Sequence, residues 1–247
     1  MRTNLIPVLF PEAGGPAGRP AGVWLDGGMS LSFQPALAAP SLLAPPVDAA
    51  LRAWPPAGEV RVAAIDPALA DTAAFCERYG VPPEESVNCV VIAGRRGGET
   101  SYAACMVTAT TRADVNGLVR RHLGVRKASF GPVDVVTSLT GMEYGGITPI
   151  GLPPEWPVLV DAAVAKLGDV PVVIGSGIRG SKLWLPGRLL AELPGAEVLP
   201  GLGVLSGCYR GVSRERAIRE RVMSEPGLTD RNKTGHPWVG QFRHLVR

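Results

Sequence analysis

Two glycine-rich segments are the strongest chemical signal in the sequence. Residues 139–152, LTGMEYGGITPIGL, hold four glycines and one proline between strand-like stretches, and residues 175–181, GSGIRGS, follow an apolar run. Glycine allows positive φ and close approach of the main chain to a ligand, while proline fixes φ, so this composition predicts stiff loops with exposed N–H groups. Such groups stabilise an oxyanion or position an ester without a protein nucleophile. The alternative is a pair of connections that only turn the chain.

Other catalytic chemistries find little support in the sequence. There is no GxxxxGK[ST] motif for phosphate, and Ser176 lies in no GxSxG motif with a histidine partner. The histidines are scattered, away from paired cysteines or carboxylates at metal-ligand spacing. They are His122, His236 and His244. We therefore expect no nucleotide hydrolysis, no Ser-His triad and no metal site. Glu143 and Asp134 remain as a general acid or base, with a purely structural role as the alternative.

Positive charge gathers in two places, although the net charge of the chain is only +3. From Arg210 onward nine Lys/Arg stand against four Asp/Glu, whereas the preceding part of the chain carries −2. The other place is a cluster at the end of an expected helix, and it comprises Arg112, Arg120, Arg121, His122, Arg126 and Lys127. Such a cluster is either a solvated face that suits the helix dipole or an anion site.

Length and composition limit the class of protein. A chain of 247 residues with 46% hydrophobic residues can build one large domain with a sizeable core. The four cysteines form no CxxC pair, which favours reduced thiols. The apolar run at residues 5–10 is too short for a signal peptide or a membrane span. We therefore expect a cytoplasmic protein without a membrane anchor.

Hydrophobic periodicity and turn residues predict the elements that must position the two loops. Helices are expected at residues 46–54, 66–80, 111–124, 186–193 and 214–223. Strands are expected at residues 60–65, 133–138, 158–160, 170–174, 182–185 and 195–199, and a central hairpin is expected to join 89–93 to 102–107. The chain is expected to divide into a flexible Gly/Pro-rich arm (1–45), one domain (46–203) and a basic extension (204–247).

Three motifs, in this order, resemble the YbaK/ProX aminoacyl-tRNA deacylase family, the free-standing relatives of the editing domain inserted in bacterial prolyl-tRNA synthetases. They are Val125-Arg126-Lys127, Leu139-Thr140-Gly141 with Gly145-Gly146-Ile147-Thr148-Pro149-Ile150-Gly151, and Gly177-Ile178-Arg179-Gly180. The resemblance implies an α/β (α+β) fold, with a mixed, partly closed β-barrel-like sheet surrounded by helices. It also implies hydrolysis of the ester that joins a wrong amino acid to tRNA. A second sieve of this kind is needed because a synthetase pocket discriminates one methylene only about 10- to 200-fold.

The resemblance also implies roles for individual residues. Catalysis, by substrate- or water-assisted cleavage, is expected at Asn88, Lys127 and Gly177. The aminoacyl substrate is expected to contact Thr140, Gly141, Tyr144, Gly145, Gly146, Ile147, Thr148, Pro149, Gly151, Ser176 and Arg179. Mischarged tRNA is expected to contact Arg112, Arg120, Arg121 and Arg126. An aminoacyl-tRNA synthetase is a further candidate partner, and no metal or cofactor is implied.

One position departs from the family pattern. The family places a lysine just before the central strand, and Asn88 stands there in Val87-Asn88-Cys89-Val90. Asparagine hydrogen-bonds a 2′-hydroxyl or a phosphate but carries no charge. Two hypotheses follow. The protein is a deacylase that works through Asn88, Lys127 and the loop backbone. Alternatively, it is a catalytically weak or inactive module in which the pocket binds tRNA or an aminoacyl ligand, or in which the tail serves as a protein-docking arm.

Overall fold

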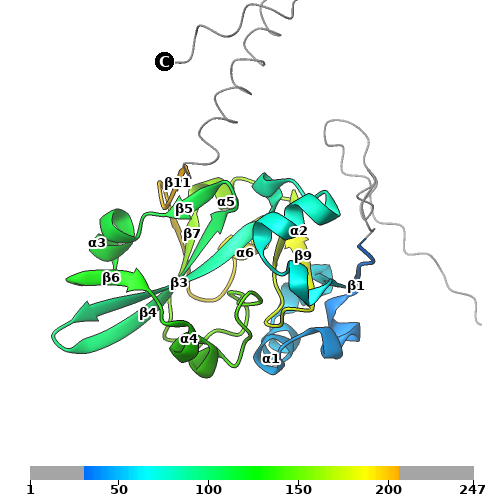
Figure 1. Cartoon of the computed structure of the whole chain (residues 1–247), viewed down its shortest axis with the longest axis horizontal. Helices are drawn as coiled ribbons and strands as arrows, with labels where there is room; N and C mark the ends of the chain where they lie inside the picture. Colours follow the sequence, from blue (N-terminus) through cyan, green and yellow to red (C-terminus); the bar gives the residue numbers. More distant parts are fainter. Residues whose placement is uncertain (1–30, 206–247) are drawn as a thin grey trace, which may run out of the picture. The chain divides into compact units, whose positions relative to one another are not determined.

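The longest strands of the protein form a hairpin from β3 (Val87–Arg96) and β4 (Glu99–Thr108). They pair along their full length, from Val87 opposite Thr108 to Arg96 opposite Glu99. Gly97 and Gly98 form the turn with φ of 60° and 90°, the left-handed conformations that a two-residue hairpin loop requires. The central hairpin predicted from the sequence is therefore confirmed. The computed structural model describes residues 31–205, which contain this hairpin and all elements below (Figure 1).

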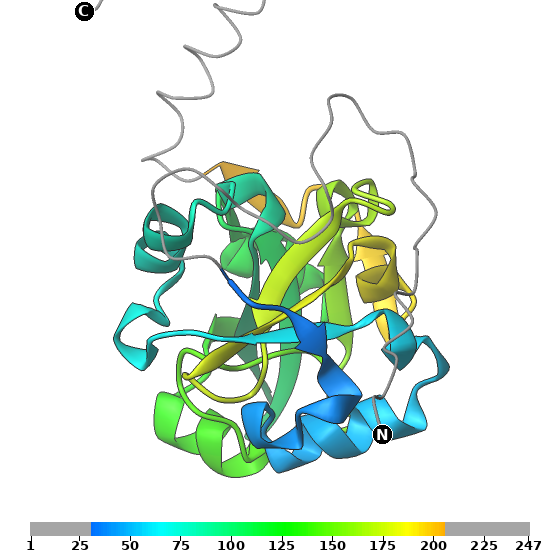
Figure 2. The same cartoon turned by 90° about the vertical axis from the view of Figure 1, so that its right-hand side faces the viewer.

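The described strands form three sheets (Figure 2). In the five-stranded sheet the order is β10-β7-β4-β3-β6, with β10 (Ala196–Leu199), β7 (Val158–Asp161) and β6 (Lys127–Phe130) beside the hairpin. The four-stranded sheet has the order β1-β2-β9-β8, with β1 (Gln34–Pro35), β2 (Arg61–Ala64), β9 (Ser181–Pro186) and β8 (Pro171–Gly175). A two-stranded sheet pairs β11 (Gly203–Leu205) with β5 (Thr111–Ala113).

These sheets do not close into a barrel, so the barrel-like part of the expected fold is wrong. Between the four- and five-stranded sheets, the only pairing within residues 31–205 is one parallel bridge that joins Ser86 to Val173. A barrel needs a continuous ladder around its whole circumference. The fold is instead a mixed α/β arrangement in which two open sheets lie edge to edge at that bridge and helices pack around them (Figure 1).

The sequence predicts helix α1 (Pro45–Ala53) well, but it predicts only the end of helix α2 (Thr72–Tyr79) correctly. Helix α1 buries Val47 and Leu51, the apolar face that the spacing predicted. Helix α2 ends as expected at Gly80, with φ of 65°, but begins later than predicted. Asp71 caps it through the N–H groups of Ala73 and Ala74, whereas Asp66 caps a separate 3₁₀ turn, Pro67–Leu69.

Residues 133–138 were expected to form a strand, and this prediction is wrong. They belong to helix α4 (Val133–Thr140), which follows Pro132 and ends at Gly141 with φ of 64°. The helix buries Val136 and Thr140, four residues apart. Proline before the first turn and glycine after the last are helix boundary signals, and here they outweigh β propensity.

The prediction of a single helix at residues 111–124 is also wrong for its first residues. Thr111 lies in β5, and Asp114 caps the helical segment by accepting from the N–H groups of Gly117 at 3.0 Å and Leu118 at 2.8 Å. A π-helical turn, Val115–Val119, then leads into helix α3 (Arg120–His122). The other α-helices within residues 31–205 are α5 (Ala162–Ala165) and α6 (Arg188–Ala191), and short 3₁₀ helices lie at Ala36–Ala38, Pro40–Leu42, Pro55–Glu59 and Pro83–Glu85.

The largest hydrophobic core of the described residues is built by helices α1 and α6 together with strands of both large sheets. Residues 31–44, assigned from the sequence to an N-terminal arm, contribute Ala36, Leu43 and Ala44 to it. No helix within residues 31–205 is long and apolar enough to cross a membrane. The predicted helix at 214–223, the basic extension beyond residue 205 and residues 1–30 of the arm lie outside the described residues.

Candidate functional site

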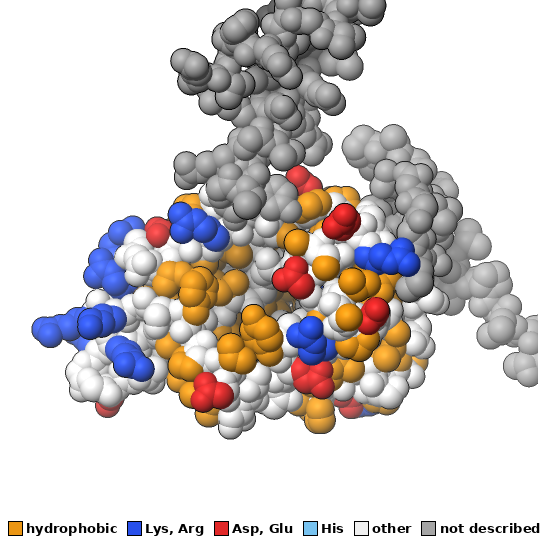
Figure 3. All heavy atoms as spheres, in the orientation of Figure 1, with side chains coloured by type: hydrophobic (Ala, Val, Ile, Leu, Met, Phe, Trp, Pro, Cys, Tyr) orange, Lys and Arg blue, Asp and Glu red, His pale blue; other side chains and the backbone are white. Residues whose placement is uncertain are grey.

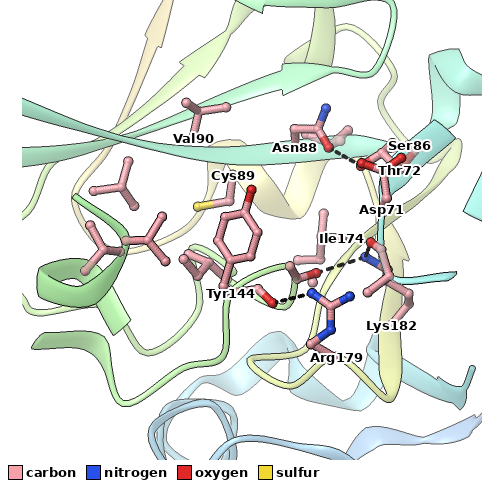
Figure 4. Close-up of a pocket in the computed structure, with 18 of the residues that line it drawn as sticks. Asp71, Thr72, Ser86, Asn88, Cys89, Val90, Tyr144, Ile174, Arg179 and Lys182 are labelled. Atoms are coloured by element: carbon pink, nitrogen blue, oxygen red, sulfur yellow. Dashed lines mark hydrogen bonds between the residues drawn. The ribbon is translucent and has the colours of Figure 1, made fainter. Parts of the chain in front are cut away.

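A cavity of about 500 Å³ lies where the two large sheets meet. Strand β3 forms one wall, strands β8 and β9 form another, and the glycine loop that follows α4 lies between them (Figure 4). The lining residues that carry polar side chains are Asp71, Thr72, Ser86, Asn88, Tyr144, Arg179 and Lys182. Of the predicted site residues, the cavity brings together Asn88, Tyr144, Gly145, Ile147 and Arg179.

The two glycine-rich loops lie directly against each other. The Gly177 N–H donates to the Gly146 carbonyl at 2.7 Å, and the Glu143 N–H donates to the Gly177 carbonyl at 2.8 Å. The Gly146 N–H donates to the Glu143 carbonyl at 2.9 Å. The N–H groups of Gly146 and Gly177 are thus occupied within the loops. The Gly177 donor, which was expected to face the substrate, joins the two loops instead, and the Gly146 donor closes a turn within the first loop.

Close packing explains why glycine is needed where the loops meet. A Cβ on Gly175 would lie 2.3 Å from the Gly146 carbonyl oxygen, and one on Gly146 would lie 2.5 Å from the Ile178 backbone. Neither neighbour can move away, because both belong to the main chain. These glycines therefore set the shape of one side of the cavity.

Arg179 and Glu143 fix the outer part of this loop pair. The Arg179 N–H donates to Glu143 Oε2 at 2.7 Å, and its guanidinium donates to the carbonyls of Tyr144 at 2.9 Å and Pro67 at 3.1 Å. Glu143, considered from the sequence as a general acid or base, is therefore held by a backbone N–H. Asp134, the other carboxylate considered, is exposed in the first turn of α4 and does not line the cavity.

Asn88 lies on β3 with a partly buried side chain. Its Oδ1 accepts a hydrogen bond from Thr72 Oγ1 at 2.7 Å (Figure 4). With the oxygen engaged, the amide group keeps two N–H donors for other partners. Asn88 can thus donate to a hydroxyl or an oxyanion but cannot supply a positive charge.

Lys182 is a cavity residue that the sequence does not indicate, as are Asp71, Thr72 and Ser86. It lies on β9 with 7% exposure, and its Nζ donates to the Ala70 carbonyl at 3.1 Å and to the Gly145 carbonyl at 3.4 Å. Nζ also lies 5.5 Å from the centre of the Phe75 ring. Burial lowers the pKa of the Lys182 ammonium, with the nearby charge of Arg179 acting in the same direction. In the sequence this lysine looks like the polar position of an alternating strand, so no local signal marks it as buried.

Cys89 also lines the cavity, but its thiol is unsuited to nucleophilic attack. Burial raises the pKa of the Cys89 thiol, and it raises the pKa of Cys105 behind it to about 12. Nucleophilic catalysis needs a thiolate, which a raised pKa disfavours at neutral pH. The cavity therefore contains no activated cysteine among its lining residues.

Other residues expected at the substrate lie elsewhere. Thr140 and Gly141 end α4, and the Ser176 hydroxyl is buried against Ser181, 2.7 Å between their Oγ atoms. Thr148 is fully buried, and Gly177 packs on Ala44. Pro149 and Gly151 line a second, apolar cavity of about 340 Å³ together with Trp54 and Trp156. These residues support the loops rather than line the first cavity.

The basic cluster forms a surface next to the cavity but not inside it. Lys127, expected among the catalytic residues, is exposed on β6 opposite Arg95, whereas Phe130 at the other end of β6 lines the cavity. Figure 3 shows Lys and Arg side chains gathered at the end of the molecule where Figure 1 places α3, β6 and the hairpin tip. We call this surface the basic face, and it comprises Arg95, Arg96, Arg120, Arg121, Arg126 and Lys127. Arg112 is exposed on β5.

Comparison with known proteins gives one family and several related folds. The family described as "Aminoacyl-tRNA editing domain" matches residues 66–193. A "Putative aminodehydroquinate synthase" of Amycolatopsis mediterranei (strain S699) is 28% identical over an alignment of 145 positions, which covers 53% of this chain and only 41% of that protein.

Several solved structures share the fold, among them the following two. One is described as "a putative trans-editing enzyme for prolyl tRNA synthetase" and superimposes with a TM-score of 0.54 at 23% identity, covering 64% of this chain and 94% of the other. A hypothetical protein superimposes with a TM-score of 0.51 at 22% identity, covering 59% of this chain and 91% of the other.

Proposed function

The chain belongs to the aminoacyl-tRNA editing domain family, and from this premise we propose that it hydrolyses the ester of mischarged aminoacyl-tRNA in the cavity that contains Asn88. The observation that carries the proposal is this cavity of about 500 Å³, built by residues inside the matched segment. Its volume suits a terminal nucleoside with a small amino acid, because small-molecule sites span roughly 300–1,000 Å³.

Two exposed aromatic side chains at the cavity support binding of a nucleoside. Phe130 is 68% exposed and Tyr144 is 62% exposed, and both line the cavity. An exposed aromatic ring is a stacking platform for a base, worth about 1–3 kcal/mol per base. The terminal adenine is therefore placed against one of these rings, with the ribose hydroxyls toward the Asn88 amide.

The basic face supports contact with the remainder of the tRNA. Strand β6 connects it to the cavity, because Phe130 lies at one end of the strand and Lys127 at the other. At about 3.3 Å per residue these two positions are about 10 Å apart. The phosphates that precede the terminal nucleoside would follow β6 toward Lys127, Arg126 and the hairpin tip. Lys127 is thus assigned to phosphate binding rather than to bond cleavage.

A second candidate function is binding without turnover. Asn88 favours it, because an uncharged amide stands where the family resemblance implies a lysine. Under this hypothesis the cavity holds an aminoacyl or nucleotide ligand and releases it unchanged.

A panel of mischarged tRNAs separates the two functions. We expect the wild-type protein to release the amino acid from at least one member, Asn88→Ala to lose turnover, and Lys127→Ala to bind more weakly with turnover at saturation preserved. Binding of tRNA by the wild type without turnover on any member would favour the binding module.

A further inference from the structure

Lys182 is a buried ammonium without a carboxylate partner in the part of the chain that is described. The ion pairs described within residues 31–205 do not involve Lys182; they include those of Arg52 with Asp48, His122 with Glu197, and Arg188 with three carboxylates. A buried charge is costly unless it is paired, and two carbonyl oxygens compensate it only in part. Retention of a charged group at 7% exposure therefore suggests a role that an uncharged side chain could not perform.

The Lys182 ammonium lies at the wall of the cavity. An ammonium has three N–H donors, and the Ala70 and Gly145 carbonyls take two of them. Lys182 lines the same cavity as Asn88, and it lies on β9 opposite Gly175 of β8, at the base of the second glycine loop (Figure 4). One donor thus remains for a ligand at the point where the two loops meet.

The other cation of the cavity is less suited to this role. Two of the guanidinium nitrogens of Arg179 already donate to the Tyr144 and Pro67 carbonyls. Asn88 is neutral, and the N–H groups of Gly146 and Gly177 bond within the loops. Lys182 is therefore the positive group best placed to meet a developing negative charge.

We infer that Lys182 is a catalytic residue of the cavity, whose ammonium binds the oxyanion formed when water attacks the aminoacyl ester. The inference rests on the proposed function. The water oxygen bonds to the carbonyl carbon, and the π electrons move to the carbonyl oxygen, which Lys182 stabilises. Collapse of this intermediate breaks the bond to the ribose oxygen, and that oxygen takes the proton that water loses. The products are the free amino acid and the tRNA hydroxyl. Lys182 on β9 thus supplies the positive charge that the Asn88 side chain lacks.

The kinetic test compares Lys182→Met, which keeps length but removes charge, with Lys182→Arg, which keeps charge. On the substrate that the wild type turns over, we expect Lys182→Met to lower kcat about 10²- to 10³-fold with KM changed less than threefold, as for loss of one oxyanion donor. Lys182→Arg should recover part of kcat. A higher KM with unchanged kcat would overturn the inference. Lys182→Gln serves if Lys182→Met does not fold, as judged by circular dichroism.

The pH profile distinguishes a catalytic charge from a mere tether between Ala70 and Gly145. After subtraction of spontaneous hydrolysis, wild-type kcat should fall at alkaline pH as the Lys182 ammonium loses its proton. The pH profile of Lys182→Met should lack this alkaline limb, the fall in kcat at high pH. The charged and titratable groups that face Lys182 are Asp71, Cys76 and Arg179. Persistence of the limb in Lys182→Met would assign it to another group and contradict the inference.

A binding experiment keeps the test independent of turnover. The probes are two adenosine conjugates, one with an aminomethylphosphonate ester, which is tetrahedral and anionic, and one with a glycyl amide, which is planar and neutral. Lys182→Met should bind the phosphonate at least tenfold more weakly and the amide equally well. Equal loss for both probes, or for neither, would refute the role of Lys182. If the wild type hydrolyses no mischarged tRNA, the proposed function fails while this comparison still decides whether Lys182 binds an anion.

Discussion

Asn88 and Lys182 hold the same short segment of chain from two sides. Thr72 Oγ1 donates to Asn88 Oδ1 at 2.7 Å, and Lys182 Nζ donates to the carbonyl of Ala70, two residues earlier, at 3.1 Å. The segment from Ala70 to Thr72 also begins helix α2, since Asp71 is its N-cap. The neutral amide and the buried ammonium are thereby positioned by one structural unit, although they come from different sheets.

Removal of the Thr72 hydroxyl tests whether Asn88 must be held in place. In Thr72→Val the Asn88 oxygen loses its partner, and we expect the free energy of unfolding to fall by about 0.5–1.5 kcal/mol. Turnover should fall as well, because the amide can rotate. Thr100→Val, an exposed change on β4, is the matched control. Chemical denaturation and deacylation assays measure both effects, and equal behaviour of the two variants would argue against a positioning role for Thr72.

Gly175→Ala tests whether the glycine loops must approach this closely. The new Cβ would lie 2.3 Å from the Gly146 carbonyl oxygen, so we expect destabilisation by about 1–3 kcal/mol or more. Gly58→Ala is the control, because a Cβ there meets nothing within 4 Å and its φ is not positive. That change should be neutral or slightly stabilising. Thermal unfolding of both variants gives the comparison, and a Gly175→Ala protein as stable as Gly58→Ala would show that the loops can separate.

The buried ammonium predicts a stability difference that depends on pH. Below the lowered pKa of Lys182, the residue is charged in both the folded and the unfolded states. Between that pKa and the ordinary value of 10.5, the folded state loses the proton first, so the unfolded state binds more protons. Wild-type stability should therefore rise relative to Lys182→Met as the pH increases through this window. Urea unfolding from neutral pH to pH 10 measures it, and a difference that stays constant would mean that the Lys182 pKa is unshifted.

The basic face predicts salt-dependent binding of tRNA. Lys127→Ala and Arg95→Ala should each weaken binding and reduce the slope of log K against log salt by about 0.7–0.9, the value for one lost phosphate contact. Arg52→Ala, on helix α1, is the control because Arg52 is exposed and pairs with Asp48 of the same helix. Fluorescence anisotropy with uncharged tRNA gives both quantities. If all three variants keep the wild-type slope, the phosphates lie elsewhere.

Elements with a clear local pattern were predictable from the sequence. The β3–β4 hairpin combines two apolar runs with Gly97 and Gly98, and α1 shows Val47 and Leu51 at helical spacing. Helix α4 was mistaken for a strand because its valines favour strands, while the signals at Pro132 and Gly141 lie outside it.

The cavity itself depends on contacts that no local pattern contains. Lys182 meets Ala70 and Gly145, which are 112 and 37 residues away in the chain. Its burial follows from the way these distant segments close over β9. The glycine loops were visible as candidates, yet N–H groups of each loop donate to carbonyls of the other, a pairing that only the folded chain reveals.

Release of the amino acid from mischarged tRNA under single-turnover conditions tests the central claim most directly. With enzyme in excess over a panel of mischarged tRNAs, we predict that the wild-type protein hydrolyses at least one member well above the spontaneous rate, and that Lys182→Met and Asn88→Ala are both slower on that member. Hydrolysis at the spontaneous rate across the whole panel, by a folded protein that binds tRNA, would contradict the account.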